Sequence, residues 1–478
     1  MISKTIEENK DKVIKLFNNT SDLIIYEFEI LSEEKAMVAY FNGIIDRIIL
    51  NEDLLKPLKQ DLISPWDVRS TVYISPIVEI TKFEDIILPI SSGCVILFIE
   101  GLNFAYNINL AKWSKRQVEK PTTEVVIRGP KESFVEDIVV NRTLIRRKIK
   151  NNNLVFEDYV IGEQTNTSVS VAYMVGIVRP EVLDEVRDKI KKIKVDKILD
   201  SGNIESYLID KPKSLISSIA YSEKPDIVVS KILEGSVAIL CDGSPNVLTV
   251  PNLFIECLHS AEDYYIRPHL ATFLRVIRLI SLFMSITLPG IYVSLVLFHQ
   301  EMVPTELLIS IAGQREGVPL SSPLEALLMI LFFELLKESS IRLPQAVGEA
   351  VTLIGGLVIG TAAVEAGVVS AFMIILISAT GMAEFVNPKL RELISISRLI
   401  FLLLGTIDGL YGVTLGLLVG ATNMVSLKSF GTPYMWPYAP YNKEGMKDSI
   451  IKTQIKKLNF RPKVISNKDS MKRNERIE

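Results

Sequence analysis

Hydrophobic and polar positions divide the chain into two parts. Up to about residue 270, apolar residues alternate with charged ones, as in a water-soluble protein. From Leu279 to Leu427, long apolar runs dominate the sequence. Because a membrane-spanning helix needs about 20 consecutive apolar residues, the pattern predicts a soluble first part followed by an all-α polytopic membrane domain.

Two short sequences recur in the first part, in the same order. VAYFNGII at 38–45 matches VAYMVGIV at 171–178, and GCVILFIEG at 93–101 resembles GSVAILCDG at 235–243. The offsets are 133 and 142 residues, and such recurrence indicates two copies of one structural unit. We therefore predict two tandem, similar α/β units, at 1–120 and 121–270.

Local signals predict the elements of these units. The β-branched and aromatic runs around Val38 and Val171 are typical of strands. The segment RPEVLDEVRDKIKKI predicts a helix that starts at Pro180, with acids first and lysines last. The pair Asp242-Gly243 predicts a hairpin turn.

A basic cluster lies on the helix predicted over 128–150, at Arg142, Arg146 and Arg147. A solvated helix face would explain these residues. The alternative is a contact with a neighbouring subunit or with lipid headgroups.

Uncharged runs in the second part predict four spans, near 279–298, 345–364, 366–386 and 399–427. The segment 322–341 differs, because four charged residues interrupt it at helical spacing: Glu325, Glu334, Lys337 and Glu338. It predicts a helix in the membrane interface, or one packed inside protein. The membrane domain then covers 271–427.

The charge distribution predicts the orientation of the membrane domain. The net charge is −3, but the tail at 428–478 carries +7. Arg275 and Arg278 precede the first span, so both flanks, and with them both termini, should be cytoplasmic. Counting 322–344 as a further span would place the tail outside. The basic tail favours an anionic membrane surface as a partner rather than nucleic acid.

Glycines at four-residue intervals predict close helix packing in the apolar part. The packing could lie within one chain, or between several copies around an axis. The candidates are Gly356, Gly360, Gly412, Gly416 and Gly420.

Acidic residues within apolar stretches are candidates for function, because a charge in the bilayer interior is unfavourable. Glu349 and Glu365 are 16 residues apart, about 24 Å along a straight helix, so both could lie near the two interfaces. Alternatively, Glu365 forms a carboxylate ring at the mouth of a pore. Its helix face also carries Ile354, Val358 and Thr361. Asp408 is a further intramembrane acid.

Enzyme signatures are absent from the sequence. The three cysteines and three histidines have no metal-ligand spacing. No GxSxG, Walker A or GxGxxG motif occurs in a suitable context. We expect no catalytic residue, cofactor or metal. The charged N-terminus does not resemble a signal peptide.

Long motifs resemble the A subunit of the GerA-type spore germinant receptors. They include REGVPLSSPLEALLMILFFELLKESSIRLPQAVGEAV, GLVIGTAAVEAGVVS and PYMWPYAPYNKEGMKDSIIK, and the similarity covers about 128–452. Glu365 in AAVEAG matches the family pattern. Glu349 and Thr361 stand where glutamine is usual, and Glu384 stands where a small residue is usual.

The resemblance implies a multi-pass protein of the spore inner membrane. It would act with a transporter-like B subunit and a lipoprotein C subunit, as the oligomeric element of a channel for monovalent cations. The alternatives are a membrane scaffold, a later-stage germination protein linked to dipicolinate release, or a secondary transporter. The last lacks the repeat between membrane segments that such transporters often show.

Overall fold

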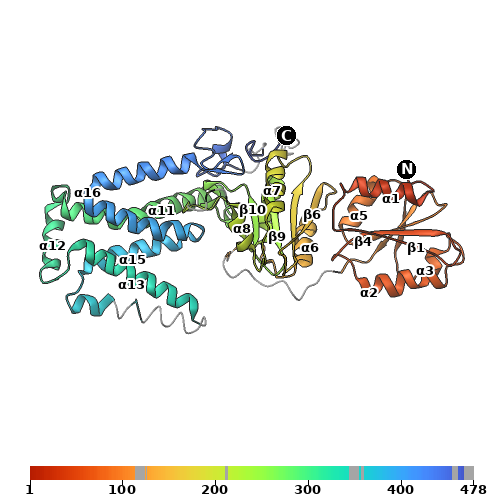
Figure 1. Cartoon of the computed structure of the whole chain (residues 1–478), viewed down its shortest axis with the longest axis horizontal. Helices are drawn as coiled ribbons and strands as arrows, with labels where there is room; N and C mark the ends of the chain where they lie inside the picture. The colour runs from red at the N-terminus through yellow and green to blue at the C-terminus, as the bar shows by residue number, and fades with distance from the viewer. Residues whose placement is uncertain are drawn as a thin grey trace.

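The computed structural model describes residues 1–112, 124, 126, 128–209, 211, 214–343, 355–356, 360–454 and 461–467. The chain forms an elongated molecule with three bodies in a row (Figure 1). Two bodies are built on five-stranded sheets, and the third is a bundle of helices.

The first body, called unit 1 here, covers residues 6–109. Its sheet has the order β1-β2-β4-β5-β3, and all its strand pairs are antiparallel. Its elements are α1 (Ile6–Leu16), β1 (Leu23–Glu29), β2 (Lys35–Phe41), α2 (Arg47–Ile49), η1 (Leu50–Leu55), α3 (Lys56–Gln60), α4 (Val68–Thr71), β3 (Ile77–Ile80), η2 (Glu84–Ile86), α5 (Ile87–Ser91), β4 (Cys94–Ile99) and β5 (Ala105–Asn109).

The second body, unit 2, covers residues 138–257. Its antiparallel sheet has the order β6-β7-β9-β10-β8. Its elements are α6 (Ile138–Lys148), β6 (Leu154–Ile161), β7 (Thr167–Met174), α7 (Pro180–Lys192), α8 (Ser201–Leu208), β8 (Ala220–Ser222), α9 (Pro225–Glu234), β9 (Val237–Cys241), β10 (Val247–Val250) and α10 (Phe254–Cys257). The helix predicted over 128–150 starts only at Ile138, because Asp137 caps it by accepting the N–H groups of Val139 and Val140.

Helices cover both faces of each sheet, so the central strands are apolar at successive positions. In unit 1, Met37 and Phe41 pack with α1 and α5, whereas Val38 packs with α3 and α4. In unit 2, α6 and α9 cover one face and α7 and α8 the other. Successive strand residues point to opposite faces, which explains why uninterrupted apolar strands are needed.

The repeated sequences occupy equivalent strands in the two sheets. Val38 on β2 pairs with Leu97 on β4, and Val171 on β7 pairs with Ile239 on β9. These partners are related by the offsets of 133 and 142 residues that the sequence shows. The two sheets therefore share strand order and, at their centre, register.

The third body contains α11 (Pro268–Leu297), α12 (Thr305–Arg315), α13 (Ser322–Arg342), α15 (Ala371–Phe385) and α16 (Arg391–Ser426), with short helices η3 (Ala261–Tyr264), η4 (Gln300–Met302) and η5 (Pro388–Leu390) at its edges. By length and composition, two helices of the described residues could cross a membrane, Pro268–Leu297 and Pro388–Ser426; Ala371–Phe385 is a shorter apolar helix. Helix α13, the predicted interfacial segment, packs within the bundle against α15.

Helix α16 is broken at Gly409, where φ is 62° and ψ is −145°. The second segment folds back along the first, since a Cβ on Gly416 would lie 2.7 Å from Cδ1 of Leu404. Leu390, before the first segment, and Leu427, after the second, share one core cluster. The apolar stretch 399–427, predicted as one span, therefore contains the tip of a helical hairpin (Figure 1).

The two ends of the bundle are defined by their neighbours. The near end adjoins unit 2, where α11 begins; the far end is where α11 ends and Phe298 packs on Gly409. Helix α11 crosses the first segment of α16 closely, because a Cβ on Gly290 would lie 2.4 Å from the carbonyl oxygen of Phe401. Ser294 Oγ donates to the carbonyl of Gly405 at 3.2 Å, which fixes this crossing.

Beyond the bundle the chain returns to unit 2. It forms a two-stranded ribbon, β11 (Lys428–Ser429) and β12 (Thr432–Pro433), and a short helix, η6 (Gly445–Lys447). Ser466 then forms a β-bridge with Val178, and Arg179 Nη1 donates to the carbonyl of Val464 at 2.8 Å. Both the start and the end of the bundle are thus connected to unit 2.

Candidate functional site

The predicted pore residues lie on a segment that the structure describes in part. Thr361 and Glu365 are exposed, one helical turn apart on the helical stretch 360–365. The structure places these two side chains on the outside of the single chain's bundle. Three other predicted residues lie outside the described residues: Glu349, Ile354 and Val358.

Asp408 directly precedes the break at Gly409 and is exposed at the tip of the α16 hairpin. It was predicted as an acid inside a single long span. The structure instead places it at the far end of the bundle, where two helices meet. A carboxylate at a helix end can reach water, which removes the reason to treat it as buried in an apolar region.

The glycines predicted for helix packing behave differently from one another. Gly412 and Gly416 pack inside the α16 hairpin, where a Cβ would lie within 3 Å of the first segment. A Cβ on Gly360 would lie 3.9 Å from Ile374. Gly356 and Gly420 face open space, so in the single chain they pack against nothing described.

Arg146 joins the two units, instead of contacting another subunit or lipid. Its side chain is 1 % exposed, and its Nε donates to Asp22 of unit 1 at 2.8 Å. Its guanidinium also lies 4.1 Å from the ring centre of Phe41. A buried charge needs such a partner, so this contact holds units 1 and 2 together.

Arg142 and Arg147 remain partly exposed. Arg142 forms a bidentate pair with Asp158 of the neighbouring strand, and Arg147 Nη1 lies 3.4 Å from Glu132. Both pairs lie within unit 2 and its N-terminal approach. The side chain of Arg142 is 13% exposed and that of Arg147 is 34% exposed, so both pairs are partly screened from water, and a contact with a subunit or with headgroups stays a prediction.

Four ionisable side chains meet inside the bundle, and we call them the bundle charge cluster: Glu334, Lys337, Glu384 and Arg398. Lys337 Nζ lies 2.6 Å from both Glu384 Oε1 and Glu334 Oε2. Arg398 bonds the other oxygen of Glu384, and its Nε donates to the carbonyl of Ser285 at 3.0 Å. The cluster thereby ties α13, α15, α16 and α11 together.

The sequence alone indicates only one of the contacts in this cluster, the pair within α13. Glu334 and Lys337 are three residues apart and share a helix face. Glu384 is 47 residues from Lys337 along the chain, and no spacing rule connects them. Glu384 stood out only because the family resemblance leads one to expect a small residue there.

A second charged group lies at the near end of the bundle, and we call it the junction cluster: Asp263, Arg275, Arg278 and Asp448. Asp263 is fully buried. Its two carboxylate oxygens accept hydrogen bonds from Nη1 and Nη2 of Arg278, at 2.7 and 2.9 Å. Burial opposes ionisation of Asp263, but its bonds to Arg278 outweigh this effect and lower its pKa. Arg275 reaches Asp448 of the C-terminal segment at 2.9 Å.

His259 stands beside the junction cluster and is held neutral. Burial and the charge of Arg275 lower the pKa of His259 to about 4. Its Nε2 lies 3.1 Å from the carbonyl of Ser449. The uncharged ring therefore bridges the segment before α11 and the C-terminal segment.

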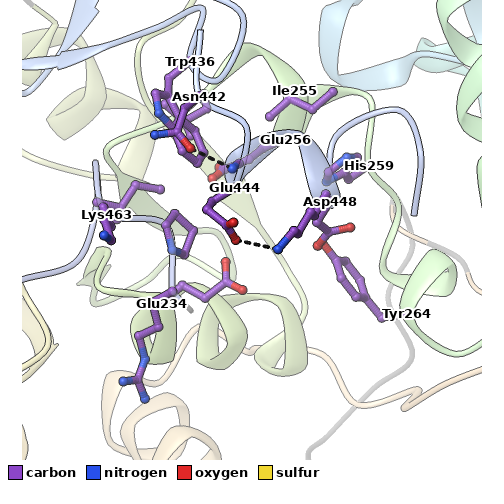
Figure 2. Close-up of a pocket in the computed structure, with 16 residues that line it drawn as sticks. Glu234, Ile255, Glu256, His259, Tyr264, Trp436, Asn442, Glu444, Asp448 and Lys463 are labelled. Carbon is purple, nitrogen blue, oxygen red and sulfur yellow. Dashed lines mark hydrogen bonds and ion pairs between the residues drawn. The ribbon is translucent and has the colours of Figure 1, made fainter. Parts of the chain in front are cut away.

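A small cavity of about 90 Å³ opens next to this junction, between the end of α9 and the C-terminal segment (Figure 2). Acidic and basic side chains alternate around it, and Glu444 pairs with Lys447 at 2.7 Å. Among the residues that the structure describes, no group of three or more His, Cys, Asp or Glu side chains could hold a metal ion.

Two similar sheets, joined to an apolar helical bundle with buried ion pairs, define a multidomain protein with candidate membrane helices. The sequence model of the Bacillus/Clostridium GerA spore germination proteins matches residues 11–464. The chain therefore belongs to the GerA family of spore germination proteins, and the resemblance seen in its motifs is confirmed.

Named relatives support this assignment. The chain is 37% identical to spore germination protein KA of Bacillus subtilis (strain 168), over 99% of this chain and 89% of that protein. It is 35% identical to the uncharacterized membrane protein YfkQ of the same organism, over 98% and 93%. A solved structure, the N-terminal domain of the A subunit of the Bacillus megaterium spore germinant receptor GerK3, aligns with 25% identity and a TM-score of 0.41, over 53% of this chain and 97% of that domain.

Proposed function

We propose that this chain is the membrane subunit of a nutrient germinant receptor, and that several copies surround a path for monovalent cations. It would act without catalysing a reaction, together with a transporter-like B subunit and a lipoprotein C subunit. Its location would be the spore inner membrane, with both termini on the core side. Membership of the GerA family and the germination role named for its relative support this proposal.

We further propose that the chain divides into two tandem cytoplasmic units (1–120 and 121–270), a polytopic membrane domain (271–427) and a basic tail (428–478). The shared strand order and register of the two sheets support the tandem arrangement. The exposed apolar side chains of the bundle, such as Ile375, Ile407 and Leu418, support its placement in lipid or against other copies.

The observation that carries the channel proposal is the exposure of Glu365. Two other acids of the bundle are buried and bonded: Glu384 pairs with Lys337, and Glu325 accepts the N–H of Ser370 at 2.6 Å. Glu365, by contrast, faces outward together with Thr361. An outward carboxylate on an apolar helix needs water or a partner subunit, and a ring of such carboxylates attracts cations.

The test is potassium efflux from proteoliposomes that hold this chain with its B and C partners, with and without a nutrient mixture. We expect nutrient-dependent efflux, and we expect Glu365→Gln to lower it severalfold, because the carboxylate ring loses its charge. Glu316→Gln is the matched control, since Glu316 is also exposed at the far end of the bundle.

Two outcomes would change the proposal. Gated efflux that responds equally to both substitutions would keep the channel and remove Glu365 from its path. No efflux from a folded complex under any nutrient would instead favour a membrane scaffold or a later-stage protein of dipicolinate release.

A further inference from the structure

A larger cavity, of about 320 Å³, lies between unit 2 and the near end of the bundle. Its walls come from the start of α9, the segment 257–261, Arg278 on α11 and the connection from α15 to α16. We call it the junction cavity. It lies where the sheet units join the apolar bundle. None of the predicted site residues lines it.

Cationic side chains predominate among the described residues that line the junction cavity. They are Lys224, Arg278 and Lys389; one carboxylate, Glu124, also lines the cavity, and Arg278 is already bound by Asp263. Lys224 is fully buried, and its Nζ donates to the carbonyl of Pro130 at 2.9 Å. The carboxylate of Asp226 lies 3.7 Å from this Nζ, beyond hydrogen-bond distance. Because the side chain of Lys224 is 0% exposed, its charge adds positive potential behind the cavity wall and makes no direct contact with a ligand.

Lys389 already contacts one anion in the cavity. Its Nζ lies 3.7 Å from Oε1 of Glu124, and its side chain is 32% exposed. At that distance the pair has charge attraction without a hydrogen bond. An anionic ligand could therefore compete with the Glu124 carboxylate for the lysine. His259 also lines the cavity, and its neutral ring neither attracts nor repels an anionic ligand by charge.

The cavity lies where lipid headgroups would be if the bundle spans a membrane. Arg278 directly precedes the uncharged run that starts at Leu279. Phe385 and Val386, at the end of α15, line the cavity, and both are exposed, as is Met382 one turn before. A ligand with an anionic head and apolar chains would fit here, with its head in the basic cavity and its chains against the exposed apolar residues of α15. Basic pockets between helices at the cytoplasmic face bind anionic lipid headgroups.

We propose that the junction cavity binds the phosphate of an anionic phospholipid, with Lys389 as its cationic contact and the acyl chains along the exposed end of α15. This inference rests on the membrane placement in the proposed function. It adds a lipid ligand that bridges unit 2 and the bundle, so the occupancy of the cavity would affect how firmly the two are joined.

The test is native mass spectrometry of the full-length chain in detergent, titrated with phosphatidylglycerol or with phosphatidylcholine of the same acyl chains. We expect phosphatidylglycerol to bind more tightly, and Lys389→Gln to weaken it about fivefold, the effect of one lysine beside an anionic lipid surface. Glu124→Gln should strengthen binding, because the competing carboxylate is lost. Lys428→Gln is the control, since Lys428 is exposed just after α16 and does not line the cavity.

The proposal is overturned if the two lipids bind equally, or if Lys389→Gln and Lys428→Gln have the same effect. Displacement of the lipid by glycerol phosphate at equal molar concentration would identify a soluble phosphate as the ligand instead. The readout needs no ion flux, so a failure of the channel proposal and a failure of this one are distinguishable.

Discussion

Removing the charge of Glu384 should destabilise the bundle strongly. Glu384 is 2% exposed and bonds both Lys337 and Arg398. In Glu384→Gln, the two cations keep only Glu334, whose side chain is 29% exposed and lies 3.8 Å from Arg398. Breaking a buried ion pair by removing one partner costs about 3–5 kcal/mol. We therefore expect the free energy of unfolding to fall by roughly 3 kcal/mol or more.

The assay is thermal unfolding of the purified chain in detergent micelles. A loss of this size should lower the midpoint by about 10 °C, since 1 kcal/mol corresponds to roughly 2–4 °C for a domain of 150–250 residues. The control is Glu338→Gln, because Glu338 pairs with Arg342 at the surface of α13, the helix that also carries Lys337, with 54% of the Glu338 side chain exposed. An exposed pair contributes at most about 1 kcal/mol.

The double variant Lys337→Met/Glu384→Gln decides whether the cause is an unpaired charge. It removes one cation and one anion together, so it should be more stable than the sum of the two single losses predicts. Strict additivity, or a Glu384→Gln variant as stable as Glu338→Gln, would refute the reasoning.

Three other contacts lead to further predictions. Because the pKa of His259 falls from 6.5 to about 4 on folding, the junction should be most stable above pH 6.5 and lose stability as the pH drops toward 4; thermal scans across this range should show the loss, and His259→Gln should reduce it. Asp22→Ala leaves Arg146 buried without its carboxylate and should destabilise the contact between units by about 3–5 kcal/mol; faster hydrogen exchange at the start of β1 and in β6 would show it, and unchanged exchange would contradict it. Gly290→Ala places a Cβ 2.4 Å from a carbonyl oxygen of α16 and should lower the midpoint, whereas Gly420→Ala, with open space around it, should leave it unchanged or raise it.

Sequence patterns predicted the elements that depend on local signals. Helix α7 starts at Pro180 as predicted, and the repeated segments fall on β2, β7, β4 and β9. These features follow from hydrophobic alternation, a helix-start proline and direct recurrence, all of which are local. The lengths of the spans and the contacts between charged residues were harder to predict from the sequence, because both depend on residues that are distant along the chain.

The break at Gly409 shows why. Gly409 lies four residues after Gly405, and that spacing is equally compatible with one long helix. What distinguishes Gly409 is its positive φ, together with the packing of Phe298 and His299 against it. Since these two residues lie more than a hundred positions earlier, no local pattern reveals the turn.

Two differences from the predicted bundle offset each other. Helix α13 packs within the bundle as an additional helix, and the α16 hairpin adds one more pass than a single span would. Each change alone would move the tail to the opposite end. Together they keep the start of α11 and Leu427 at the near end, as the core cluster that contains Leu282 and Leu427 shows. The start of α11 and Leu427 therefore lie at the same end of the bundle, and the cytoplasmic side of both termini stays a prediction.

The return of the chain to unit 2 has a mechanical consequence. A domain that is tethered by one linker can swivel freely and transmits no torque to the neighbouring domain. Here unit 2 contacts the chain on both sides of the bundle: Tyr265, just before α11, donates to Asp226 of α9 at 2.9 Å, and Ser466, after α16, forms a β-bridge with Val178. The ion pair between Arg146 and Asp22 connects unit 2 to unit 1 in turn. The two sheet units are thus joined to each other and to the chain on both sides of the bundle, so a tilt of unit 1 would act on α11 and on the segment after α16 at once.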